Sequence, residues 1–175
     1  QYTTDGFVSF NSDGFTLGAN VNSPQPDINY TNNIARVAWC WDAGSSTVTN
    51  TAGSITSQVR ANASAGFSIV TYTGTSVNAT IGHGLGVAPS LILVKTRSIN
   101  YNWAVYHIAT GNTQFLYLDQ TAAASANSTA WNNTSPTSSV FSVGSGTLMN
   151  ALSQTHVAYC FAPVAGLSAF GSYTG

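Results

Sequence analysis

The acidic side chains of this chain do not form a recognisable acid–base pair. All five are aspartates, and they are spread along the sequence: Asp5, Asp13, Asp27, Asp42 and Asp119. Asp5 and Asp13 each precede a glycine, and Asp-Gly pairs are typical of tight turns. Glycoside hydrolysis needs two carboxyl groups that flank one bond, and nothing in this spacing brings two of them together. A polysaccharide depolymerase is therefore the least favoured of three functions, below a structural module and a carbohydrate-binding module.

The three histidines also lack the spacing of a reactive site. His83, His107 and His156 are far apart, and no cysteine or carboxylate motif for a metal accompanies them. A Ser-His-Asp triad depends on geometry alone, so it stays open, but the chain has no Gly-x-Ser-x-Gly elbow. We expect all three to be structural histidines, and we expect no metal, no cofactor and no enzymatic activity.

Aromatic rings and amides occur together in several short segments, and this combination suits carbohydrate binding. The segments are residues 101–103, residues 106–107, Tyr117 and residues 131–133. Sugar rings pack on aromatic planes, while amides and carboxylates bind their hydroxyl groups. The alternative is that Trp103, Tyr106 and Tyr117 alternate along strands and fill the core. Trp131 lies in a polar loop, residues 127–138, as either a plug over one end of the fold or an exposed contact. The candidate glycan-binding residues are Trp103, Tyr106, Asp119, Trp131 and Asn132.

The elements that position these side chains are predicted to be strands. Short runs rich in Val, Ile, Thr, Tyr and Phe alternate with Gly, Asn, Asp and Ser. Residues 43–65, rich in Ser, Thr, Asn and Gly, predict a loop or spacer, and residues 121–126 could form a turn or two of helix. The pattern predicts an all-β fold, an antiparallel β-sandwich or jelly-roll. The predicted strands are residues 7–10, 15–19, 35–41, 67–72, 77–81, 91–96, 103–107, 114–118, 139–143, 146–150, 156–161 and 168–173.

The sequence contains an internal repeat. Residues 37–41 (VAWCW) return as residues 157–161 (VAYCF), and residues 66–74 return as residues 166–175. Such self-similarity is typical of modules that occur in arrays. We expect residues 1–74 to hold the C-terminal part of a first unit with a spacer, and residues 75–175 a complete second unit. The chain would then begin within a unit, either as a piece of a longer protein or to complete a neighbour's sheet.

The two cysteines, Cys40 and Cys160, occupy matching positions in this repeat. Each is therefore expected on the inward side of its own strand, where a bridge between them would require the two copies to meet across those strands. Unpaired cysteine behaves as a small apolar residue. We expect two buried, free thiols.

Composition limits the partners of this protein. Only 5% of the residues are charged, four basic and five acidic, against roughly 25% in ordinary globular proteins. A net charge of −1 without a basic cluster gives no electrostatic basis for nucleic-acid binding. No apolar run is long enough to predict membrane insertion. A surface of uncharged polar side chains suits fibres, capsids and secreted adhesins.

Several separated motifs, in order, resemble a known family. They are residues 83–89 (HGLGVAP), 91–95 (LILVK), 102–107 (NWAVYH), 116–118 (LYL), 131–137 (WNNTSPT), 157–161 (VAYCF) and 170–175 (FGSYTG). Together they resemble a domain of unknown function that recurs in structural proteins of tailed bacteriophages, often beside concanavalin-like lectin modules. The resemblance covers about residues 72–175 and, to a lesser extent, residues 5–41. It implies a place in a virion but no catalytic or binding residues.

These observations predict a non-enzymatic virion structural module, of a tail fibre, spike or head decoration. Its partners would be copies of itself and other virion proteins, and its location the virion or the extracellular space. A neutral, Thr-rich exposed strand edge would be a docking site for the next subunit. The alternative is a carbohydrate-binding module that recognises host surface polysaccharide.

Overall fold

The computed structural model describes residues 7–18 and 35–173. The chain divides into two compact units, residues 1–40 and residues 41–175. In the first unit, β1 (Phe7–Phe10) and β2 (Phe15–Leu17) form an antiparallel hairpin, which confirms two predicted strands. Residues 35–40 have no regular secondary structure, so the strand predicted there is wrong.

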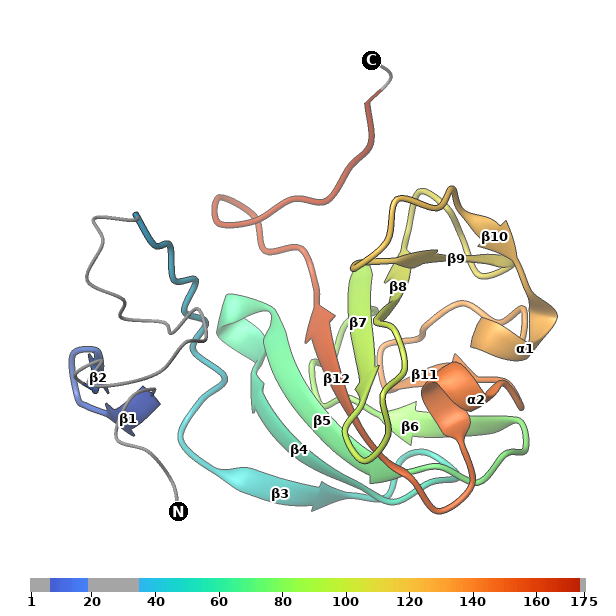
Figure 1. Cartoon of the computed structure of the whole chain (residues 1–175), viewed down its shortest axis with the longest axis horizontal. Coiled ribbons are helices and arrows are strands. Elements are labelled where there is room, and N and C mark those ends of the chain that lie inside the picture. The colour runs from blue at the N-terminus through green and yellow to red at the C-terminus, as the bar shows by residue number, and fades with distance from the viewer. Residues whose placement is uncertain (1–6, 19–34, 174–175) are drawn as a thin grey trace, which may run out of the picture. The chain divides into compact units, whose positions relative to one another are not determined.

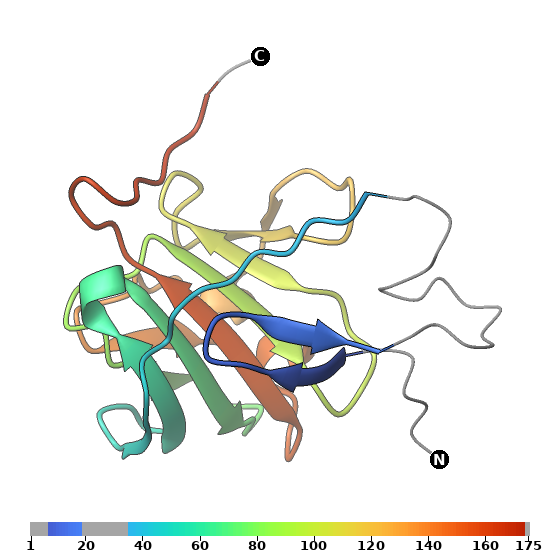
Figure 2. The same ribbon diagram turned by 90° about the vertical axis from the view of Figure 1, so that its left-hand side faces the viewer.

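The second unit is built on one eight-stranded antiparallel sheet (Figure 1). Its strand order is β10-β9-β8-β7-β12-β5-β4-β3, and Figure 2 shows β12, in red, between β5 and β7. β12 pairs with both neighbours along its length. The bounds are β3 (Thr47–Asn50), β4 (Ser57–Asn62), β5 (Phe67–Thr73), β7 (Leu91–Thr96), β8 (Ala104–His107), β9 (Gln114–Tyr117), β10 (Ser125–Ala126) and β12 (Thr155–Phe161).

A smaller layer covers the inner face of this sheet. It contains the antiparallel pair β6 (Ala79–Gly82) and β11 (Val140–Val143), with the short helices α1 (Ser128–Trp131) and α2 (Thr147–Asn150). Every second residue of the large sheet points into the core between the layers, as strand geometry requires. Val70, Val94 and Cys160, for example, are fully buried there. This arrangement confirms the predicted all-β, sandwich-like fold.

Residues 43–65 are not the predicted spacer, because they contain β3, β4 and a short 3-10 helix, Ala63–Ala65. Ser57 and Val59 point inward and are buried, whereas Gln58 and Arg60 face outward. A sheet with one solvated face tolerates such polar strands. The Ser-, Thr- and Asn-rich composition therefore suggested a loop, whereas the alternation of buried and exposed side chains is that of a strand.

The strand predicted at residues 146–150 is a helical turn, α2. Met149 and Asn150 are both buried, and consecutive residues of a strand would point to opposite faces. Residues 169–173 form no strand, and residues 121–126 form no helix but end in β10. The repeat stays a feature of the sequence, because its matching segments, 37–41 and β12, have different structures.

The division predicted at residue 74 stays a prediction, although it falls inside the unit of residues 41–175. Both described cysteines are free; Cys160 is buried as expected, but Cys40 is exposed because residues 35–40 belong to no sheet. In the described part of the chain, no helix has the length and hydrophobicity to cross a bilayer.

Candidate functional site

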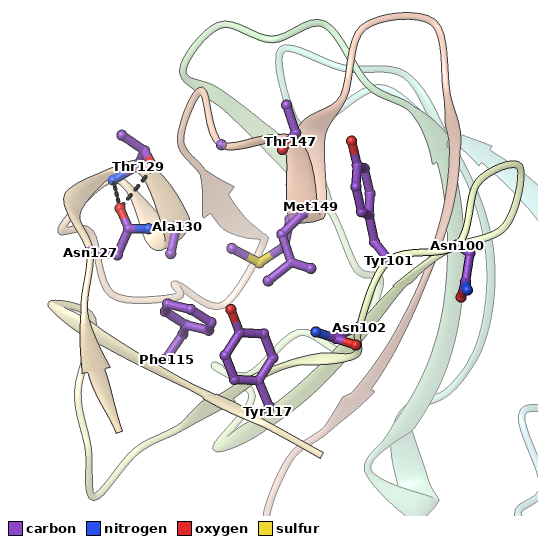
Figure 3. A pocket seen from close by; sticks show the side chains of 12 residues that line it. Asn100, Tyr101, Asn102, Phe115, Tyr117, Asn127, Thr129, Ala130, Thr147 and Met149 are labelled. Carbon is purple, nitrogen blue, oxygen red and sulfur yellow. Dashed lines mark hydrogen bonds between the residues drawn. The ribbon is translucent and has the colours of Figure 1, made fainter. Parts of the chain in front are cut away.

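A pocket of about 370 Å³ opens where the β9 side of the large sheet meets α1 and α2. This volume lies within the range of roughly 300–1,000 Å³ that is typical of ligand sites. Figure 3 shows Tyr101 across the pocket from Phe115 and Tyr117. The lining comes from four separate segments: residues 100–102, β9, residues 127–130 and residues 146–149.

Each wall of the pocket is held by local structure. Phe115 and Tyr117 lie two apart on β9, so both point inward, and their rings meet edge-on with centroids 4.9 Å apart. Asn127 is the N-cap of α1: its side-chain oxygen accepts hydrogen bonds from the Thr129 backbone N–H (2.9 Å) and from the Thr129 hydroxyl (2.7 Å). Met149 on α2 is buried and forms an apolar part of the wall.

Several polar groups of the pocket have no partner within the described structure. The Tyr117 hydroxyl, the Asn102 amide and the Thr147 hydroxyl make no hydrogen bond to residues 7–18 or 35–173. Tyr117 and Asn102 are half-buried, and Thr147 is exposed. No described lining residue carries a charge. The pocket thus offers free donors and acceptors beside aromatic rings, in a neutral environment.

The outer face of the large sheet carries a row of aromatic rings, which we call the aromatic row: Trp41, Phe161, Phe67, Tyr159 and Trp103, in that order. Successive rings have centroids about 5 to 6.5 Å apart, as in packed aromatic pairs. The Lys95 ammonium lies 5.9 Å from the centre of the Trp103 ring and donates a hydrogen bond to the Tyr101 carbonyl.

The structure brings the five predicted glycan-binding residues together only in two separate pairs. Trp103 donates its backbone N–H to the Asp119 carboxylate at 3.2 Å, at the end of the aromatic row. Tyr106 and Trp131 meet edge-on in the core, 5.7 Å apart, and both are buried. Asn132 ends α1 in the left-handed region, with φ of 52°. None of the five lines the pocket.

Of the two roles considered for Trp131, the structure shows the plug. The side chain is 1% exposed and belongs to the core between the layers, because α1 turns it inward. Its indole N–H has no hydrogen-bond partner in the part of the chain that is described. Trp131 therefore serves packing and does not contact solvent.

His83 and the thiol of Cys160 are both buried inside the fold. The ring of His83 bonds the Thr137 carbonyl (3.1 Å) and accepts from the Leu85 N–H (3.2 Å); burial lowers its pKa, and the Thr137 carbonyl opposes this in part. Burial raises the pKa of Cys160 to about 12, so the thiol stays protonated. The described residues contain no cluster of three or more His, Cys, Asp or Glu side chains that could hold a metal.

Two of the three described aspartates, Asp42 and Asp119, accept hydrogen bonds from backbone or side-chain amides. Asp42 accepts from the Gly44 N–H (2.7 Å) and from the Asn62 amide (3.0 Å), and Asp119 accepts from Trp103. Asp5 and Asp27 lie outside the described residues.

Part of the pocket could be found from the sequence. Tyr101, Asn102 and Tyr117 belong to the aromatic and amide segments that suggested sugar binding, and all three line it. The contributions of α1 and α2 were missed, because no local pattern shows that residues 127–130 and 146–149 face β9.

The comparisons with curated proteins and with solved structures found no match to this chain. In the comparison with protein families, one family model matches residues 1–175. The whole chain therefore belongs to the family described as a domain of unknown function, DUF7483.

Proposed function

We propose that this chain is a non-enzymatic structural module of a virion, in a tail fibre, spike or head decoration, that assembles with copies of itself. The single observation that supports assembly most strongly is the edge strand β3. The resemblance of the sequence to a domain of phage structural proteins supports the virion as its location. Few charges and a surface of Thr, Ser and Asn are in keeping with such a role.

β3 ends the large sheet and pairs with β4 alone among the described strands. Its four residues, Thr47–Asn50, include no charge and no proline, and the first three are exposed. Natural proteins usually protect such edges with charges, proline or bulges, because an unpaired edge adds strands from another molecule. The opposite edge, β10, has only two residues and offers much less.

A charge on this edge is the direct test of assembly. Val48 lies opposite Val59 on the inward side of the sheet but is 55% exposed at the rim, so the long side chain of a lysine can reach solvent there. We expect the wild-type chain to self-associate and Val48→Lys to raise the dissociation constant by at least about tenfold. Sedimentation velocity over a range of concentrations measures both.

The matched control is Leu152→Lys, which adds the same charge at a 64% exposed position between α2 and β12. It should associate like the wild type. A wild-type chain that stays monomeric at the highest soluble concentration contradicts the proposal, as does equal association of the two lysine variants. For the virion, the chain should appear in mass spectra of purified particles.

A further inference from the structure

We propose that the pocket between β9, α1 and α2 is a binding site for a neutral saccharide. This inference stands apart from the assembly proposed above, because it uses none of the residues of β3. It also differs from the glycan site expected from the sequence, whose five residues lie elsewhere.

The chemistry of the lining selects a ligand with both an apolar face and several hydroxyl groups. Tyr101, Phe115 and Tyr117 contribute rings, and Met149 adds an apolar wall. A pyranose ring presents C–H groups on one face, which pack on such aromatic surfaces. Purely apolar ligands would leave the polar groups of the same wall without partners.

The polar groups are placed to serve hydroxyl groups. The Asn102 amide offers both a donor and an acceptor, and the Tyr117 hydroxyl does the same. Neither makes a hydrogen bond within the described residues, so a ligand needs to displace only water. Asn127 keeps its oxygen on Thr129, which fixes the amide and leaves its N–H₂ group available.

The absence of charge among the described lining residues argues for a neutral sugar. A carboxylate or phosphate on the ligand would lose water without gaining a cationic partner. The Lys95 ammonium lies beside residues 100–102, but it is engaged with the Tyr101 carbonyl and the Trp103 ring.

The test is a titration of the full chain with D-glucose, D-galactose, D-mannose and N-acetyl-D-glucosamine, followed by saturation-transfer NMR. D-glucuronic acid serves as the charged probe. We expect at least one neutral sugar to bind with a dissociation constant in the millimolar range or below. Tyr117→Phe and Asn102→Ala each remove polar groups without enlarging the core, and each should weaken that binding by about fivefold, the effect of one hydrogen bond.

Matched controls lie on other surfaces. Asp119→Asn, at the end of the aromatic row, and Val48→Lys, on the edge strand, should bind the same sugar as the wild type does. The proposal is overturned if none of the four neutral sugars binds, or if both pocket variants bind as tightly as the wild type. Loss of binding in Asp119→Asn would move the site to the outer face, and tighter binding of glucuronic acid than of glucose would overturn the assignment of a neutral ligand.

Discussion

At the scale of single residues, His156 shows how burial decides ionisation in this protein. The ring is fully buried and stacks on Tyr72, with centroids 5.1 Å apart. The Thr96 hydroxyl donates to the Leu148 carbonyl (3.0 Å), so it is left to accept from Nδ1–H of His156 (3.2 Å). Nε2 then carries no proton and has no hydrogen-bond partner among the described residues. Burial lowers the pKa of His156 to about 4, and the nearby Ala151 carbonyl offsets this only in part.

The lowered pKa predicts a loss of stability in mild acid. The unfolded chain binds a proton on His156 near pH 6.5, whereas the folded chain does so only near pH 4. The stabilisation is therefore complete above about pH 6.5 and is lost as the pH falls toward 4, by up to about 3 kcal/mol. His156→Phe keeps a ring on Tyr72 but cannot titrate, so its free energy of unfolding should fall less between these pH values. Urea unfolding at pH 7 and pH 4 measures the difference.

His107→Gln is the control for this prediction, because His107 is only half-buried and lies outside the core. It should lose stability with falling pH as the wild type does. Burial also lowers the pKa of His83, so the stability of every variant should still depend on pH to some extent. An equal slope in the wild type and His156→Phe would show that His156 does not cause the loss.

At the scale of elements, Asn150 ties α2 to the connection between β5 and β6. Its amide N–H₂ group donates to the carbonyl groups of Val77 (2.7 Å) and Gly144 (2.8 Å). Its amide oxygen accepts from the Thr75 N–H (2.7 Å). The side chain is fully buried, so these three bonds satisfy the donors and the acceptor of the amide where solvent does not reach it.

Asn150→Asp should therefore destabilise the fold strongly. The change keeps the shape of the side chain but replaces two donated hydrogen bonds by a carboxylate oxygen that faces two carbonyl oxygens. We expect a loss of about 3–5 kcal/mol in the free energy of unfolding, because a buried charge is left unpaired. Asn78→Asp, in the same connection but exposed, adds the same charge and should change stability by less than about 0.5 kcal/mol. Equal effects in denaturant unfolding would contradict this role of Asn150.

The same elements show what the sequence could predict and what it could not. Residues 91–96 form a strand with the predicted bounds, because a continuous apolar run at the centre of a sheet has few alternatives. α2 could not be predicted from its own four residues, since its conformation depends on hydrogen bonds between Asn150 and partners up to 75 positions away. The pocket has the same limit: the inward direction of Phe115 and Tyr117 follows from β9, but the other walls depend on tertiary contacts.

At the scale of the whole molecule, a single hydrophobic core stabilises the compact unit of residues 41–175. All core residues between the two layers fall between Ile55 and Ala162. They come from both sides of residue 74: Val59, Val70 and Tyr72 precede it, and most others follow it. β5 pairs with β12 along all seven of its residues, Phe67–Thr73. The core therefore depends on residues before position 75, which the sequence repeat assigns to a separate unit of residues 1–74.

Two truncations separate the possible boundaries. A chain of residues 41–175 keeps the complete core and should unfold in one cooperative transition in a calorimeter. A chain of residues 75–175 lacks β3, β4 and β5, so it exposes one side of β12 and loses Val59, Val70 and Tyr72 from the core. We expect it to show no cooperative transition, because each large buried side chain contributes about 1.5–3 kcal/mol to a domain whose total stability is only about 5–15 kcal/mol. Cooperative unfolding of residues 75–175 would instead support the boundary at residue 74 and would make the first three strands of the sheet an addition to a module that is already complete.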